Sequence, residues 1–350
     1  MLTDLQLRHF RCFDSLRVDF APGFNFFIGQ NGQGKTSILE AACVLLRLQS
    51  QRSATLAPLV KKESKWFGAS GTCDGHRLEF RYSALRRKLQ FDEVEQRGAA
   101  EYLRIGRVVS LANTDIELVR GGSEFRRRYL DFLGLQIEPS YRATLRAYER
   151  ALRARNMLLK SPQPRVREVA AYDAPLLEHG SKLGALRAAL LRRLAPFVSE
   201  AHREISGLRE AFTLEFLAGN GEDFAADLLA SAPNQARLRQ TVVGPHRDDI
   251  ALLVDGMAAS QYASEGQQRT IALALKIGQA RVFAAEEETQ PLLLIDDIFG
   301  ELDPVRRNRL LRALPVDAQK LVTATSMSWR EEPCDGPVFA LTSGVLSLTT

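Results

Sequence analysis

The chain has 350 residues, enough for about two domains, and its 45% hydrophobic and 25% charged residues are typical of a soluble globular protein. No run is apolar enough to span a membrane and the first residues lack the core of a signal peptide, so we expect a cytoplasmic protein without a membrane partner. The 47 Lys and Arg exceed the 42 Asp and Glu, and the net charge of +5 is compatible with nucleic acid without requiring it. The four cysteines are far apart and form no CxxC pair, so the sequence suggests neither a zinc site nor a disulfide framework.

Short strands and turns dominate the first 112 residues. Asp74-Gly75 lies between two strand-like segments and predicts a hairpin turn. The segment VDFAPGFNFFIG (18–29) ends in an apolar run that predicts a strand. The next segment, TSILEAACVLLRL (36–48), predicts a helix by its length and apolar density.

Residues 113–240 have a different, mainly helical character. Long helical patterns cover 141–160 and 171–205, and the proline-containing segment SPQPR (161–165) separates them. No internal repeat or sustained heptad pattern is present.

Strand patterns return in the last third of the chain. Asp255-Gly256 predicts a second hairpin turn, and the uniformly apolar PLLLI (291–295) predicts a central parallel strand covered on both faces. Segments 321–325 and 338–348 complete a sheet. We therefore predict an α/β fold in which a discontinuous domain, 1–112 and 241–350, carries an inserted, mainly helical domain at 113–240.

The segment GQNGQGKT (29–36) fits the pattern G-x-x-x-x-G-K-[ST] between a predicted strand and a predicted helix. In such a P-loop, backbone N–H groups surround the phosphates of ATP, Lys35 reaches the β and γ oxygens, and the Thr36 hydroxyl ligates Mg²⁺. An ordinary glycine-rich turn with an exposed lysine is the alternative, but the strand and helix on either side favour the P-loop. The predicted nucleotide-binding residues are Gly29, Gln30, Asn31, Gly32, Gln33, Gly34, Lys35, Thr36 and Ser37.

Two carboxylates follow the predicted central strand. Asp296 stands where a P-loop ATPase places its second Mg²⁺-linked acid, and Asp297 could orient or activate the attacking water. Two aspartates after a strand are more often a cap or a turn, but the P-loop favours the functional interpretation. We predict Asp296 as a metal ligand and Asp297 as the catalytic residue.

The stretch SEGQQR (264–269) begins a helix that is otherwise a buried, apolar one. Ser264 is a natural N-cap, and a helix N-terminus carries unpaired N–H groups and a partial positive charge that suit an anion. The stretch resembles the S-x-G-Q core of the ABC-type ATPase signature, and GELD (300–303) resembles the D-loop. In those proteins the signature helix faces the γ-phosphate held by the P-loop of another subunit. The resemblance implies that Ser264, Gly266 and Gln267 bind the ATP of a partner.

Further segments narrow the resemblance. LQLRHFRCFDSLRVDF (5–20) is similar to the start of SMC-type heads, in which an arginine at the position of Arg11 approaches the nucleotide. Together with LVRGGSEFRRRYLDF (118–132), VVGPHRDDI (242–250) and LLIDDIFGELD (293–303), it resembles the RecF family of bacterial repair ATPases over nearly the whole chain. The motifs at Lys35 and Asp296 lie 261 residues apart and prolines interrupt the intervening helices, which argues against the long coiled coil of a true SMC protein.

The resemblance implies an ABC-type P-loop ATPase head assembled from both chain ends, with ATP and Mg²⁺ as cofactors. It implies an ATP-dependent homodimer that binds duplex DNA and single/double-strand junctions. It further implies slow, DNA-stimulated hydrolysis that acts as a switch, and assistance to RecA loading together with RecO and RecR. Two other functions stay open: an SMC-like ATPase of a defence system, and, less favoured, the nucleotide-binding subunit of a membrane transporter.

Three departures from the family pattern stand out. Glu265 occupies a position where the family usually has Gln, and it adds an acid near the expected phosphate. Thr325 falls where ABC ATPases carry a switch histidine, although the RecF family tends to have Thr there. The segment VVSLANTDIELV (108–119) is too loose a match to assign a glutamine-loop residue.

Two further patterns have open interpretations. GPHRDD (244–249) could be a Gly-Pro turn with a local Arg–Asp pair, or part of an ATP-linked subunit interface. On the predicted helix at 141–160, arginines recur on one face and Tyr and Leu on the other, which suits either a solvated face or contact with DNA phosphates. Other histidines are scattered without metal-ligand spacing. The predicted DNA-binding residues are Arg142, Arg146, Arg150 and Arg153.

Overall fold

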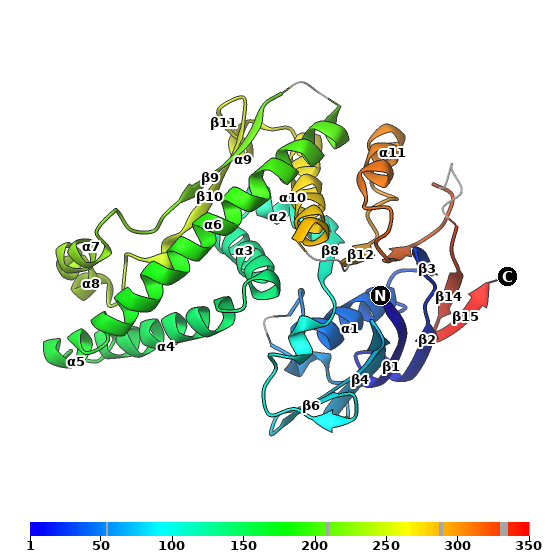
Figure 1. Cartoon of the computed structure of the whole chain (residues 1–350), viewed down its shortest axis with the longest axis horizontal. Coiled ribbons are helices and arrows are strands. Elements are labelled where there is room, and N and C mark those ends of the chain that lie inside the picture. Colours follow the sequence, from blue (N-terminus) through cyan, green and yellow to red (C-terminus); the bar gives the residue numbers. More distant parts are fainter. Residues whose placement is uncertain (54, 208–209, 287–289, 330–334, 350) are drawn as a thin grey trace. The chain divides into compact units, whose positions relative to one another are not determined.

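The computed structural model describes residues 1–53, 55–207, 210–286, 290–329 and 335–349 (Figure 1). The chain divides into two compact units. Unit 1 comprises residues 1–115, 204–207 and 273–350, and unit 2 comprises 116–203 and 208–272. The predicted boundaries at 112 and 241 remain a prediction. Cys334, one of the four cysteines, lies outside the described residues.

A mainly parallel sheet organises unit 1, with the strand order β15-β14-β3-β13-β12-β8. All neighbours are parallel except β15, which pairs antiparallel with β14 at one edge. The sheet confirms the predicted strands near both ends of the chain. The strands are β3 (Phe24–Ile28), β8 (Val108–Ala112), β12 (Leu292–Asp296), β13 (Lys320–Ala324), β14 (Val338–Thr342) and β15 (Val345–Thr349).

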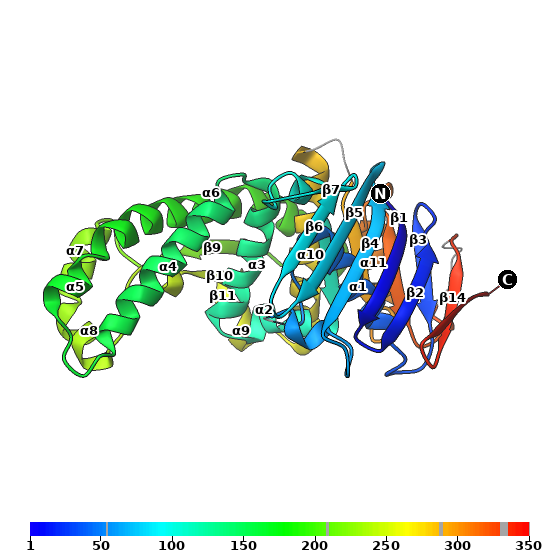
Figure 2. The ribbon, with the colours of Figure 1, turned by 90° about the horizontal axis from the view of Figure 1, so that it is seen from below.

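An antiparallel sheet with the order β2-β1-β4-β5-β6-β7 forms the other layer of unit 1 (Figure 2). Its β4–β5 turn confirms the predicted hairpin, because Asp74 and Gly75 both have positive φ, 51° and 82°, as a type I′ turn requires. Helix α1 (Lys35–Arg47) contacts strands of both sheets, so its apolar faces are covered on two sides. The strands are β1 (Leu2–Phe10), β2 (Phe13–Asp19), β4 (Trp66–Cys73), β5 (His76–Ser83), β6 (Arg87–Phe91) and β7 (Val94–Glu95).

Unit 2 is mainly helical, as predicted for the middle of the chain, but it contains a small antiparallel sheet with the order β11-β10-β9. Strand β10 includes the pattern predicted at 250–254, and its neighbour β9 comes from the inserted region. The predicted Asp255-Gly256 hairpin is confirmed between β10 and β11. The strands are β9 (Phe212–Leu217), β10 (Asp249–Val254) and β11 (Met257–Ala258).

The structure confirms the two long helices predicted for the middle of the chain. The two long helical segments form α4 (Tyr141–Leu159) and α6 (Asp173–Ser206), and the short α5 (Val166–Ala170) lies between them in sequence. Within the described ranges, no helix is both long and apolar enough to cross a membrane. The remaining helices are α2 (Glu117–Arg120), α3 (Ser123–Ile137), α7 (Phe224–Ala230), α8 (Ala232–Leu238), α9 (Ala259–Tyr262), α10 (Glu265–Glu286) and α11 (Pro304–Ala313), with 3₁₀ turns η1 (Ala57–Leu59), η2 (Tyr102–Arg104), η3 (Asn113–Ile116) and η4 (Pro245–Arg247).

Candidate nucleotide site

The predicted P-loop connects the end of β3 to the start of α1 in unit 1. Gly34 caps the helix with φ 106°, a conformation that L side chains rarely adopt. A Cβ atom there would lie 2.7 Å from the Cys12 Sγ and 2.9 Å from the Phe13 ring. Backbone shape and close packing therefore both require glycine at this position, as a phosphate-binding loop does.

Lys35 is buried inside this loop rather than exposed on a turn. Its ammonium donates hydrogen bonds to the carbonyl oxygens of Gly29 and, at 3.0 Å, Gln30. Burial lowers the pKa of Lys35, and the nearby carboxylates of Asp297 and Asp296 oppose that shift. The two carbonyl oxygens hold the ammonium inside the loop, where phosphate oxygens could take over its hydrogen bonds.

The carboxylate of Asp296 lies within hydrogen-bond distance of the P-loop helix. Its Oδ1 accepts a bond of 2.8 Å from the Thr36 hydroxyl and one of 2.7 Å from the Thr323 hydroxyl on β13. The two residues predicted to ligate Mg²⁺ are therefore adjacent. A hydroxyl and one carboxylate fit Mg²⁺, which completes its shell with phosphate oxygens and water, and no denser cluster of His, Cys, Asp or Glu occurs in the described ranges.

Asp297 follows directly, in a backbone conformation that is uncommon for an aspartate, with φ 53°. Its N–H faces the Thr323 hydroxyl at 3.0 Å, and its carbonyl accepts from the Asn113 amide at 3.1 Å. Burial is the main cause that raises the pKa of the Asp297 carboxyl, and the charges of Asp296 and Glu301 add to it while Lys35 opposes it. A raised pKa is what a group that receives a proton from water needs.

These side chains surround one pocket of about 620 Å³. Seven of the ten predicted nucleotide residues of unit 1 line it, whereas Gly29, Gln30 and Gln33 do not. The pocket also has a rim that the sequence did not single out, Arg52, Pro58, Val60 and Lys62. Gln33 turns elsewhere, since its side-chain oxygen accepts the Ser343 N–H at 2.6 Å. The lining residues are Arg11, Cys12, Asn31, Gly32, Gly34, Lys35, Thr36, Ser37, Arg52, Pro58, Val60, Lys62, Asp296 and Asp297.

Arg11 lines the pocket, and its guanidinium is held by a buried acid. Glu40 on α1 accepts two bonds from it, Nε–Oε2 at 2.9 Å and Nη2–Oε1 at 3.0 Å. A third bond goes to the Pro58 carbonyl at 3.1 Å. This fork fixes the arginine in one orientation. Glu40 was missed in the sequence because it lies inside an otherwise apolar helical run.

The predicted signature lies in unit 2, at the start of α10. Ser264 and Gln267 form a capping box: the Gln267 N–H donates to the Ser264 hydroxyl at 3.3 Å, and the Ser264 N–H donates to the Gln267 side chain at 2.8 Å. Gln267 also donates to Glu210 at 2.9 Å. The Ser264 hydroxyl accepts in this box, so its own proton can be directed to an incoming acceptor, and Gly266 lies in the same first turn.

The conspicuous acid of this turn is engaged by two arginines. Glu265 pairs with Arg120 of α2 at 3.4 Å and with Arg269 at 3.2 Å. Hydrogen bonds to Arg269 and Arg120 lower the pKa of Glu265. The carboxylate is therefore ionised and partly neutralised.

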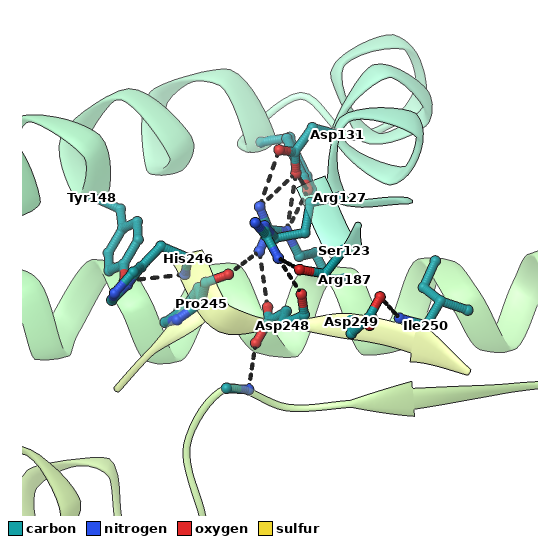
Figure 3. A network of polar contacts seen from close by, with 12 residues as sticks. Ser123, Arg127, Asp131, Tyr148, Arg187, Pro245, His246, Asp248, Asp249 and Ile250 are labelled. Atoms are coloured by element: carbon teal, nitrogen blue, oxygen red, sulfur yellow. Dashed lines mark hydrogen bonds and ion pairs between the residues drawn. The ribbon is translucent and has the colours of Figure 1, made fainter. Parts of the chain in front are cut away.

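Another group in unit 2 is the network around GPHRDD, built on Arg187 of α6 (Figure 3). This buried guanidinium donates to both Asp131 oxygens at 2.9 and 3.0 Å, to the Pro245 carbonyl at 2.6 Å and to Asp248 at 2.9 Å. The other oxygen of Asp248 accepts the Gly219 N–H at 2.8 Å. One arginine thus ties together three segments that are distant in sequence.

The interpretation of GPHRDD as a local Arg–Asp pair is wrong, because its aspartates pair with arginines from other segments of the chain. Arg247 is exposed, whereas Asp249 is held by a two-pronged bond from Arg126 of α3, at 2.6 and 2.9 Å. Arg127 donates to the Asp248 carbonyl at 2.7 Å. Sequence neighbours suggested the local pair, but the preceding Gly-Pro turn points both acids toward other helices. The interface role of the motif stays a prediction.

His246 of the same motif should make stability depend on pH. Its Nε2–H donates to the Thr241 carbonyl at 2.9 Å, which leaves Nδ1 to accept from the Tyr148 hydroxyl at 2.7 Å. Burial, above all, lowers the pKa of His246 from 6.5 to about 4. The unfolded chain therefore takes up the proton first. The contribution of neutral His246 to the free energy of unfolding is fully present above pH 6.5. It is lost as the pH falls toward 4, by up to about 3 kcal/mol.

Urea unfolding of the wild type and of His246→Gln, measured at several pH values between 4 and 6.5, checks this expectation. Glutamine can keep a donor and an acceptor in place but does not titrate. The wild type should lose more stability than the variant on acidification. Parallel losses in the two proteins would show that His246 is not the group responsible.

The predicted arginine stripe lies on α4 in unit 2. Arg146, Arg150 and Arg153 are exposed, while Tyr141 and Tyr148 of the other face are buried. Arg142 differs, because it is half-buried, and burial together with the neighbouring Arg146 lowers its pKa. Three of the four positions therefore present charge to solvent.

Comparison with known proteins places this site in a family. The model of the RecF/RecN/SMC N terminal domain matches residues 1–332. A protein of Symbiobacterium thermophilum named DNA replication and repair protein RecF is 38% identical, with 99% of this chain and 98% of the relative covered. A protein of the same name from Synechococcus sp. strain JA-2-3B'a(2-13) is 37% identical, with 93% and 91% covered.

Solved structures agree. The recombination mediator protein RecF-ATPrS of the RecFOR pathway is similar with a TM-score of 0.91 and 28% identity, and the match covers 100% of this chain and 98% of that one. An Smc head bound to the C-winged helix domain of ScpA is similar with a TM-score of 0.58 and 14% identity over 99% and 96% of the chains, which shows the shared fold alone. The chain therefore belongs to the RecF family of DNA replication and repair proteins, with the ABC-type ATPase head fold that this family shares with SMC proteins.

Proposed function

We propose that this protein is an ATP-dependent DNA-binding switch of recombinational repair. The observation that carries the proposal is the pocket in which Lys35, the Thr36–Asp296 pair and Asp297 converge. Each is the group that phosphate, Mg²⁺ or an attacking water needs. A solved relative described as RecF-ATP, similar with a TM-score of 0.89 and 28% identity, supports the nucleotide.

In this proposal the chain's own residues divide the work. Gly29 to Ser37 cradle the phosphates, Lys35 neutralises the β and γ oxygens, and Thr36 and Asp296 hold Mg²⁺. The metal, when bound, supplies positive charge that stabilises charge developing on the phosphates. Arg11, fixed by Glu40, approaches the nucleotide from the rim. Asp297 accepts a proton from the attacking water.

The first turn of α10 completes the site of a second copy of the chain. Ser264, Gly266 and Gln267 present a hydroxyl, a close backbone approach and N–H groups to a γ-phosphate held by the partner's P-loop. Two copies close head to head on ATP, and hydrolysis reopens them. The RecFOR pathway named for the solved relative supports RecO and RecR as partners. In this proposal the closed dimer, with these partners, guides RecA to gapped DNA.

Sedimentation velocity with and without ATP–Mg²⁺, in the presence or absence of a DNA duplex, tests this function. We expect a monomer without nucleotide, a dimer with ATP–Mg²⁺, and a larger, faster-sedimenting complex with DNA only when ATP–Mg²⁺ and the duplex are both present. A protein that stays monomeric on saturation with ATP–Mg²⁺ and DNA would refute the proposal.

DNA affinity should fall steeply with salt, and the exposed arginines of α4 should carry part of that dependence. Each neutralised phosphate contributes about 0.9 to the slope of log K against log salt. Replacing Arg146, Arg150 and Arg153 with Gln should lower the slope by up to about three units per engaged protomer. Preference for sequence should not change, because phosphate contacts do not read bases. Fluorescence anisotropy over a salt series measures the slope.

A matched control replaces three exposed arginines of unit 1, Arg86, Arg87 and Arg97, with Gln. An unchanged salt slope in the folded α4 variant would show that these arginines form a solvated face and do not contact DNA. A lowered slope in the control alone would place the DNA path on the antiparallel sheet. The other basic segment, 126–128, is a weaker candidate, because Arg126 and Arg127 are already bound to Asp249 and Asp248.

A further inference from the structure

The acid in the signature turn needs an explanation, because the proposed role of this turn is to meet a phosphate. Glu265 is exposed and ionised. A negative charge beside an incoming phosphate opposes binding, because like charges repel each other. Arg120 lies beside this carboxylate, with its Nη2 3.4 Å from the Glu265 Oε2.

Arg120 also holds the backbone of the turn. Its Nε donates to the Gln268 side-chain oxygen at 2.5 Å. The amide of Gln268, which is buried, donates in turn to the carbonyls of Ala263 at 2.9 Å and Ala259 at 3.4 Å. Ala263 directly precedes Ser264. One arginine therefore reaches both the charge beside the turn and the peptide that enters it.

Hydrogen bonds hold the segment that carries Arg120 in place. Arg120 ends α2, and Arg126 of α3 donates to the carbonyls of Leu118 at 3.2 Å and Gly121 at 2.8 Å, which fixes the α2–α3 connection. Arg126 is itself clamped by Asp249, the last residue of GPHRDD. Its neighbour Arg127 joins the buried Arg187–Asp248 network (Figure 3).

We propose that Arg120 is a positioning residue for the signature: it neutralises Glu265 and fixes the turn through Gln268, so that this chain tolerates an acid beside the partner's phosphate. GPHRDD and the segment 118–132 then have one joint task, to anchor Arg120. The inference rests on the proposed ATP-dependent dimer and names the residue that keeps its signature competent.

If Arg120 acts by neutralising Glu265, removing the acid should rescue the loss of the arginine. Arg120→Gln leaves Glu265 paired with Arg269 alone and should raise the dissociation constant of the ATP–Mg²⁺ dimer by about tenfold or more, because each dimer contains two such turns. Glu265→Gln alone should leave that constant within about twofold of the wild type. Arg120→Gln combined with Glu265→Gln should recover most of the loss, since the unpaired acid is gone.

The experiment is sedimentation velocity of the full chain over a concentration series with ATP–Mg²⁺. Arg128→Gln is the matched control. Arg128 is an exposed arginine of α3 that pairs with Glu124, and its substitution removes the same charge from the protein as Arg120→Gln does. Binding of a fluorescent ATP analogue to the monomer, which uses the P-loop in unit 1, should be equal in all variants. Circular dichroism confirms that each variant is folded.

The outcomes separate this inference from the function on which it rests. If the wild type does not dimerise with ATP–Mg²⁺, the proposed function fails and the inference with it. If the wild type dimerises and Arg120→Gln matches Arg128→Gln, only the inference fails. If Arg120→Gln is impaired and the double variant is equally impaired, Arg120 acts as a plain structural contact and the charge compensation is refuted.

Discussion

Ser264→Arg is expected to abolish ATP-dependent dimerisation while ATP binding to the monomer stays nearly intact. The reason is that the signature turn and the P-loop pocket belong to different units of one chain, so the substitution leaves the pocket residues untouched. A long side chain at the first turn fills the space through which a partner's phosphate must come within hydrogen-bond distance. Sedimentation with ATP–Mg²⁺ and binding of a fluorescent ATP analogue measure the two effects separately.

The capping role of Ser264 has to be separated from its proposed role toward the partner. Losing the hydroxyl removes its bond to the Gln267 N–H and costs about 1 kcal/mol of helix stability. Ser264→Thr keeps a capping hydroxyl, so it should dimerise. Ser264→Ala removes the hydroxyl without adding bulk, so it reports the capping loss together with the hydroxyl's contact to phosphate. Normal dimerisation of Ser264→Arg would remove the basis for assigning SEGQQR to a partner's ATP.

The two carboxylates after β12 should fail in different ways. Asp297→Asn should keep ATP and Mg²⁺ bound but slow turnover by about 10² or more, since a proton acceptor in the transition state contributes that much. Asparagine tolerates positive φ as well as aspartate does, so the backbone at 53° should be unaffected. The trapped dimer should persist for longer than the wild-type dimer. Single-turnover hydrolysis and the lifetime of the dimer measure the two quantities.

Asp296→Asn should instead weaken Mg²⁺-dependent ATP binding by about tenfold or more, because charge-assisted interactions contribute about 1.5–3 kcal/mol. An amide can still accept from Thr36 and Thr323, so the fold should survive. ATP titrations at a series of Mg²⁺ concentrations distinguish lost metal affinity from lost nucleotide affinity. Identical defects in the two variants would show that the division of roles between Asp296 and Asp297 is wrong.

Much of the fold was predictable because it depends on local patterns. The apolar runs of β3 and β12, the Asp-Gly turns and the P-loop spacing each act over a few residues, and the structure has them where expected. The pairing of the strands was harder to predict from the sequence. Strand β10 pairs with β9 from the inserted region, and nothing in the pattern IALLV indicates which neighbour it takes.

The residues of the site also divide into those that the sequence predicts and those that only the fold brings together. The lysine, hydroxyl and carboxylates of the pocket could be named because their order along the chain is diagnostic. Asn113 and Thr323 could not, because each reaches the pair of aspartates only through the alignment of β8, β12 and β13. Likewise, the arginines that hold GPHRDD come from residues more than 50 positions away.

The strand order of the parallel sheet has a consequence for biosynthesis. Strand β3 lies between β13 and β14, so the partners of both its edges are encoded about 300 residues later in the chain. At about 5–20 residues per second, a ribosome exposes β3 for roughly 15–60 s before β13 emerges. The apolar run FNFFI is open to wrong pairing throughout that interval. Nascent chains that stall before residue 320 should therefore depend on chaperones, whereas the residues of unit 2 are all available earlier.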